Sequence, residues 1–148
     1  MTKPETSAAM RNAVVAMYAG LALTVVAAVV TALGGDAVSK HVFELEAPYV
    51  GAEVAAGSGS FMVIYLLALY AVGVVCWLGL SWAARAGRRW VRPVAIVVLL
   101  GAAGLAALNL TVEEYGTRVL PLPVALAGLL PCAAGVVAVV FLWRARVR

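Results

Sequence analysis

Few side chains in this sequence have the type and spacing that a reactive centre needs. Cys76 and Cys132 lie far apart, and a thiol oxidoreductase requires a paired motif such as Cys-x-x-Cys. His41 and Glu44, at i and i+3, supply two metal ligands where zinc sites take three or four. We therefore expect no catalytic residue, no metal site and no cofactor.

Ionisable side chains are confined to the ends and connections of the long apolar runs described below. The adjacent acids Glu113 and Glu114 fit a solvated helix end better than an acid pair. Proton- or ion-coupled carriers usually hold an ionisable group near the membrane midplane, and no apolar run contains one. With no nucleophile–base set visible, the sequence predicts a protein that is not an enzyme.

Polar uncharged side chains at membrane depth leave two interpretations open. Tyr65, Tyr70 and Asn109 all fall inside apolar runs. Hydrogen bonds between helices are one account, and these contribute roughly 0.6 kcal/mol each in a bilayer. A small ligand cavity lined by the same three side chains is the other.

The amino-acid composition indicates whether water or lipid surrounds this chain. The 148-residue chain is 65% hydrophobic and 12% charged, whereas soluble domains carry about 25% charged residues. A soluble fold of this length cannot bury so much apolar surface, so lipid must surround much of it. We expect one membrane domain over residues 1–148.

Four apolar runs have the length that a bilayer demands, because a helix needs about 20 residues to cross it. The predicted fold is all-α, a bundle of four transmembrane helices. The spans cover residues 13–33, 61–84, 93–110 and 120–143, joined by outer loops 34–60 and 111–119 and by residues 85–92. Residues 1–12 read as a polar disordered tail.

Two local features refine this outline. Val38, Val42 and Leu45 fall at i, i+4 and i+7, which predicts a short amphipathic helix on the membrane surface in the first outer loop, ended by Pro48. Pro131 should kink the fourth span near Ala127, because proline removes a backbone donor.

Charge predicts the orientation. The two tails and residues 85–92, which we call the arginine hinge, hold nine of the eleven basic residues. Basic loops stay inside, so both termini are expected in the cytoplasm. The net charge of +4 then needs no nucleic acid. We expect the hinge arginines to meet anionic lipid headgroups, with a specific acidic lipid as the sharper alternative. They are Arg85, Arg88, Arg89 and Arg92.

The chain resembles a group of small, uncharacterised four-span integral membrane proteins of actinobacteria. The resemblance lies in residues 14–21 (VVAMYAGL), 52–54 (AEV), 82–92 (WAARAGRRWVR) and 139–144 (VVFLWR). Its most specific part is the hinge, whereas the first outer loop is shorter and less charged than in that group. The likeness implies that this protein is located in the plasma membrane of a bacterium. It implies no activity for any residue of this chain.

Two functions follow as hypotheses. The first is a non-catalytic accessory or scaffold subunit that binds another membrane protein, or a second copy of itself, through faces of small residues. The alternative is a small transporter, or a membrane protein that binds a lipid or another small molecule. This alternative includes a dimeric form of the protein. Membrane lipids are expected partners in either case.

Overall fold

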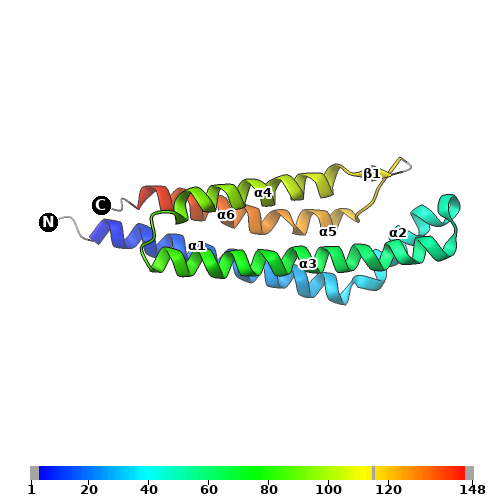
Figure 1. Ribbon diagram of the computed structural model, residues 1–148, viewed down its shortest axis with the longest axis horizontal. Coiled ribbons are helices and arrows are strands. Elements are labelled where there is room, and N and C mark those ends of the chain that lie inside the picture. Colours follow the sequence, from blue (N-terminus) through cyan, green and yellow to red (C-terminus); the bar gives the residue numbers. More distant parts are fainter. Residues whose placement is uncertain (1–3, 115, 146–148) are drawn as a thin grey trace.

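The protein is a bundle of four membrane-crossing helices (Figure 1). This computed structural model describes residues 4–114 and 116–145. The helices that are long and apolar enough to cross a membrane cover Ala8–Leu33, Ala52–Arg85, Val91–Thr111 and Leu122–Arg144. The chain is therefore a multi-pass membrane protein with the all-α architecture that its sequence predicts.

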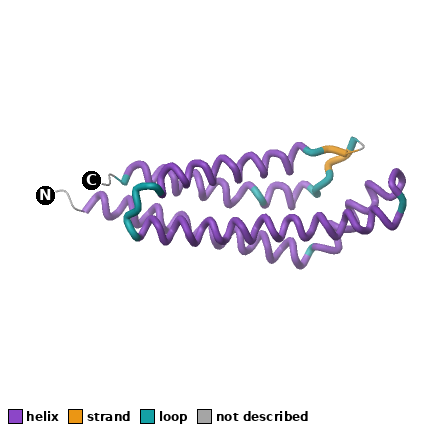
Figure 2. The backbone as a smooth tube through the Cα atoms, viewed as in Figure 1, coloured by secondary structure: helices purple, strands orange, loops and turns teal. Residues whose placement is uncertain are grey.

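Helices account for nearly all of the described backbone (Figure 2). The elements are α1 (Pro4–Leu33), α2 (Gly35–Val50), α3 (Ala52–Arg85), α4 (Val91–Thr111), α5 (Leu122–Ala127) and α6 (Leu129–Arg144). Between α4 and α5, β1 (Glu113–Glu114) and β2 (Thr117–Arg118) form a short antiparallel hairpin with Glu113 opposite Arg118. The two chain ends and the α3–α4 connection lie at one end of the bundle, the terminal end. The far end carries α2 and the β-hairpin (Figure 1).

The amino-terminal segment corrects the expectation of a disordered tail. Helix α1 begins at Pro4, well before residue 13, and Pro4 suits a first helical turn because its missing N–H would have no partner there. Ala8, Ala9 and Met10 are strong helix formers. Met10 also packs on buried residues of the bundle, and this contact favours continuing the helix. Residues 1–3 of the expected tail lie outside the described range.

The first outer loop forms the expected amphipathic helix, but in a different setting. Helix α2 packs along α3, which begins at Ala52 and is much longer than the predicted span. Val38 and Val42 are buried, so the apolar face of α2 meets α3 rather than a membrane surface. Pro48 lies in the last turn of α2 and does not end it. Gly59 permits the close approach, because a Cβ there would lie 2.7 Å from the carbonyl oxygen of Ser39.

Helix α1 is the centre of the bundle. It packs along both α3 and α6, and α4 packs along α6, whereas α3 and α4 touch only briefly. The buried residues accordingly form two separate groups. The terminal-end cluster contains Ala13, Ala16, Met17, Leu80, Ala83, Ala84, Val91, Ala95, Ala138 and Leu142. The far-end cluster contains Ala27, Val38, Leu66, Tyr70, Leu120 and Ala125.

The fourth span is broken where the proline predicts a kink. Helix α5 ends at Ala127 and α6 begins at Leu129, with Gly128 between them. Pro131 cannot donate a hydrogen bond to the carbonyl of Ala127, which removes one rung of the helical ladder. The thiol of Cys132 donates to the carbonyl of Gly128 at 3.7 Å and supports the backbone at the break.

Candidate functional site

A cavity of about 300 Å³ lies between α3 and α4, in the space left because these helices barely touch. Its walls come from α3, α4 and the broken fourth span, and α1 adds Met17 and Thr24. Most of the lining is aliphatic, and none of the described residues that line it is charged. We call this feature the α3–α4 groove.

The groove opens sideways between the two helices. Val72 on α3 lines it and is 61% exposed, and Leu105 on α4 lines it and is 38% exposed. Gly101, also in the lining, leaves open space where a side chain would stand. A lipid chain can therefore reach the groove from the side of the bundle.

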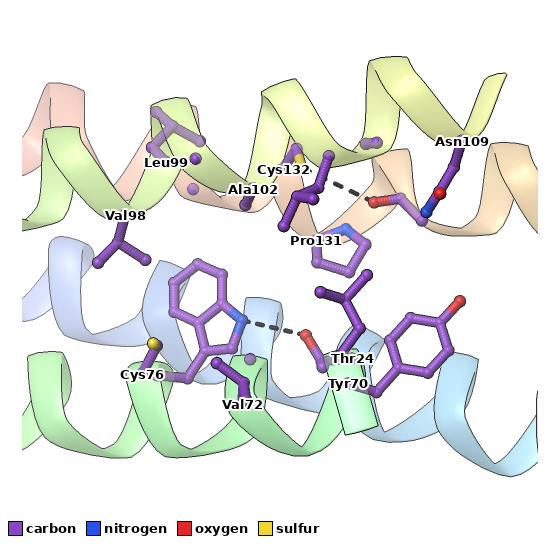
Figure 3. Close-up of a pocket in the computed structure, with 18 of the residues that line it drawn as sticks. Thr24, Tyr70, Val72, Cys76, Val98, Leu99, Ala102, Asn109, Pro131 and Cys132 are labelled. Atoms are coloured by element: carbon purple, nitrogen blue, oxygen red, sulfur yellow. Dashed lines mark hydrogen bonds between the residues drawn. The ribbon is translucent and has the colours of Figure 1, made fainter. Parts of the chain in front are cut away.

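Trp77 forms the middle of one wall. Its indole Nε1 donates a hydrogen bond to Oγ1 of Thr24 at 3.0 Å, and Thr24 in turn donates to the carbonyl of Gly20 at 2.8 Å (Figure 3). The ring lies against Gly20, where an added Cβ would come within 2.3 Å of it. A Cβ at Gly135 on α6 would lie 2.8 Å from Cδ1 of Leu99 and 3.7 Å from the indole, so this glycine mainly makes room for Leu99. The lack of a side chain at Gly20 lets α1 approach the indole.

The position of Trp77 differs from what tryptophans near helix ends usually indicate. Trp82, Trp90 and Trp143 are exposed by 63%, 46% and 57%, as rings at a membrane interface are. Trp77 is instead about 12 Å along α3 from Arg85 and points into the bundle. No motif in the sequence marks this role, because the partners Gly20, Thr24 and Gly135 belong to other spans.

Two of the three tyrosine and asparagine residues singled out by the sequence line the groove. Tyr70 and Asn109 are among its lining residues and stand at the same end of it, on opposite walls (Figure 3). Tyr65 is outside the groove and packs beside the far-end cluster. Since Tyr65 precedes Tyr70 by five residues, it faces a different side of α3.

The Tyr70 side chain is 7% exposed, yet within residues 4–114 and 116–145 its hydroxyl makes no hydrogen bond. The half-buried Asn109 amide has no partner there either. No fully enclosed side-chain nitrogen or oxygen lacks a partner in that part of the chain. Both polar groups therefore keep access to the open groove.

Both cysteines line the groove as well. Cys76 belongs to α3 and Cys132 to α6, both are free thiols, and they are well separated (Figure 3). Their placement is that of small apolar side chains in a wall. No pattern in the sequence links them to Tyr70 and Asn109.

At the far end, the candidate metal ligands have other contacts. Nε2 of His41 donates to the backbone carbonyl of Arg118 at 3.1 Å, joining α2 to β2. Glu44 lies 3.8 Å from the amine of Lys40 in an exposed ion pair. No group of three potential metal ligands occurs among the residues that the structure describes.

The hinge arginines divide into two pairs. Arg85 donates to the hydroxyl of Tyr18 and places its guanidinium 5.0 Å from the centre of that ring. Arg92 donates to the carbonyl of Ala145. Arg88 and Arg89 are exposed and have no side-chain partner among the described residues. The first pair ties parts of the bundle together, whereas the second makes no such link among the described residues.

A scan against protein-family models found no match, and searches of the curated proteins and of the solved structures found none either.

Proposed function

We propose that this protein binds a lipid-like molecule in the α3–α4 groove, without catalysing a reaction. Its place would be the plasma membrane of a bacterium, with both termini in the cytoplasm, as the resemblance and the basic hinge and tails imply. The observation that carries the proposal is an uncharged, largely apolar groove open to the lipid between two membrane-crossing helices.

Size is compatible with a small ligand. The groove holds about 300 Å³, at the lower end of the range for small-molecule pockets, about 300–1,000 Å³. A narrow ligand such as a single alkyl or isoprenoid chain suits a space of this size.

The test fills the groove by mutation. Ala102 on α4 lines the groove, while the equally exposed Ala107 on the same helix does not. Ala102→Phe should lower the amount of co-purified lipid, measured by mass spectrometry per mole of protein, by about tenfold, which corresponds to about 1.4 kcal/mol of lost binding. Ala107→Phe is the matched control and should retain the lipid. Equal retention by both variants would contradict the proposal.

An accessory role remains the second candidate, and one feature favours it. The 34 residues of α3 extend about 51 Å, well beyond a hydrocarbon core of about 30 Å. The α2–α3 hairpin consequently reaches past the far end of α4 (Figure 1). Near its tip Val54 is 58% exposed, and Phe61, further along α3, is 68% exposed. Val54 lies outside the predicted span 61–84 and Phe61 lies at its edge, and exposed apolar side chains at or beyond the edge of the lipid favour a protein partner.

Crosslinking at native expression levels tests this second role. A partner held by the hairpin should give a crosslinked species of defined mass that Val54→Ser removes. Lys40→Ser changes an exposed position on the neighbouring α2 and should leave that species intact. A protein that stays alone under these conditions would exclude the accessory role while leaving lipid binding in place.

A further inference from the structure

The groove has polar groups of a particular kind at one end. Towards the terminal end its lining is aliphatic, as at Val98 and Leu99, and towards the far end it offers the hydroxyl of Tyr70 and the amide of Asn109. Figure 3 shows these two side chains on facing walls, with the tyrosine oxygen directed towards the space between the helices. The groove is thus polar at one end and apolar along the rest.

Tyr70 gives the strongest indication of a ligand. The side chain is more than nine-tenths buried, and its hydroxyl has no hydrogen-bond partner among the residues that the structure describes. The hydroxyl oxygen itself is not fully enclosed, because no enclosed side-chain oxygen in the described part of the chain lacks a partner. At membrane depth a hydroxyl without a hydrogen bond still costs free energy, so native structures normally provide a partner for it. The groove is the side from which that partner can come.

We infer that the ligand is a neutral amphiphile with a hydroxyl or carbonyl head held between Tyr70 and Asn109. This inference rests on the proposed function. The Tyr70 hydroxyl can donate to or accept from such a head, and the Asn109 amide can do the same. Within residues 4–114 and 116–145 no charged side chain lines the groove, and an ionised head without a counter-charge is expensive to bury at membrane depth.

The length of the groove also predicts the length of the ligand's apolar chain. Leu99 precedes Asn109 by ten residues on α4, which places it about 15 Å closer to the terminal end. An extended chain advances roughly 1.2 Å per bond, as three backbone bonds span about 3.3–3.6 Å. A straight chain of about twelve carbons therefore reaches from the Asn109 level to the Leu99 level.

Trp77 offers a direct readout because it lines the groove near the Leu99 level, where both side chains lie beside Gly135. The exposed Trp82, Trp90 and Trp143 are changed to phenylalanine, which leaves Trp77 as the reporter. The protein is placed in phosphatidylcholine nanodiscs and titrated with four twelve-carbon probes brominated on the chain. They are a monoacylglycerol, an alkane, a carboxylate at pH 9 and a trimethylammonium.

The monoacylglycerol should quench Trp77 saturably and at the lowest mole fraction. Tyr70→Phe and Asn109→Ala should each raise the half-saturating fraction by about fivefold, the loss expected for one hydrogen bond. Tyr65→Phe, on the same helix but outside the groove, should leave it unchanged. The phenylalanine variant at position 70 loses only an oxygen, and circular dichroism checks that it remains folded.

The outcomes separate the two proposals. Equal quenching by the alkane and the monoacylglycerol, or no effect of Tyr70→Phe, would overturn the neutral head while leaving chain binding intact, and a water molecule would then satisfy Tyr70. Tighter binding of either charged probe would overturn the neutral head too.

If no probe quenches Trp77, and co-purified lipid is equal in Ala102→Phe and Ala107→Phe, the proposed function itself is overturned. If the tryptophan replacements disturb folding, native mass spectrometry of monoacylglycerol retention by the otherwise unmodified protein with and without Tyr70→Phe decides instead.

Discussion

The indole of Trp77 and the hydroxyl of Thr24 are joined by a hydrogen bond of 3.0 Å between α3 and α1. Thr24 is 3% exposed, and its own proton goes to the carbonyl of Gly20. The bond holds the indole inside the bundle, where it packs against the terminal-end cluster. One wall of the groove therefore depends on a polar contact between two spans.

Removing the threonine hydroxyl should loosen this wall. Thr24→Val keeps the shape of the side chain but leaves the indole N–H of Trp77 without its acceptor. We expect a loss of about 0.6–1.7 kcal/mol in the free energy of unfolding, the measured range for hydrogen bonds between membrane helices. Unfolding by a denaturing detergent measures it. Thr111→Val is the control, because the hydroxyl of Thr111 bonds only to its own helix.

The stability of the protein should also depend on the space that Gly20 leaves for the Trp77 indole. A Cβ at Gly20 would lie 2.3 Å from the Trp77 ring, whereas a Cβ at Gly79 would meet nothing within 4 Å. Gly20→Ala should destabilise the protein by about 1–3 kcal/mol through overpacking, and Gly79→Ala should not destabilise it. The same unfolding assay compares them. In the double variant with Trp77→Ala, most of the Gly20→Ala penalty should disappear, and full additivity would contradict the contact.

The α2–α3 hairpin has a similar close approach outside the bundle. Gly59→Ala would bring a Cβ within 2.7 Å of the Ser39 carbonyl, and backbone is less able to move aside than a side chain. We expect α2 to detach and its amides to exchange with deuterium at least tenfold faster, an opening equilibrium shifted by about 1.4 kcal/mol. Gly57→Ala, with open space around the new methyl group, should leave exchange unchanged.

Orientation can be checked independently of packing. Fusions of green fluorescent protein and of alkaline phosphatase to the carboxyl end should be fluorescent and inactive, respectively, because basic tails and loops are expected to stay in the cytoplasm. Fusions after residue 50, at the tip of the α2–α3 hairpin, should show the opposite result. An active phosphatase at the carboxyl end would contradict the topology and leave the helical bundle unaffected.

The class of the protein and its four spans follow from local properties of the sequence. Apolar length decides whether a helix can cross a bilayer, and each predicted span is largely helical because backbone groups in lipid must be satisfied within the segment. The break beside Ala127 is equally local, since Pro131 removes a donor whatever surrounds it. Helix ends were less predictable: α1 and α3 continue past their apolar runs because tertiary packing stabilises the added turns.

Only the tertiary structure determines which helix faces pack against one another. Tyr65, Tyr70 and Asn109 looked equivalent as polar residues in apolar runs, and the rotation of α3 turns Tyr70 into the groove and Tyr65 away from it. Trp77 is one of the four tryptophans of the chain, and only the packing of α1 on α3 shows that Gly20 makes room for its ring. The groove exists because α1 and α6 form the central pair, which leaves α3 and α4 apart. Helix pairing in lipid depends on the shape of small-residue faces rather than on hydrophobicity, and composition does not encode that shape.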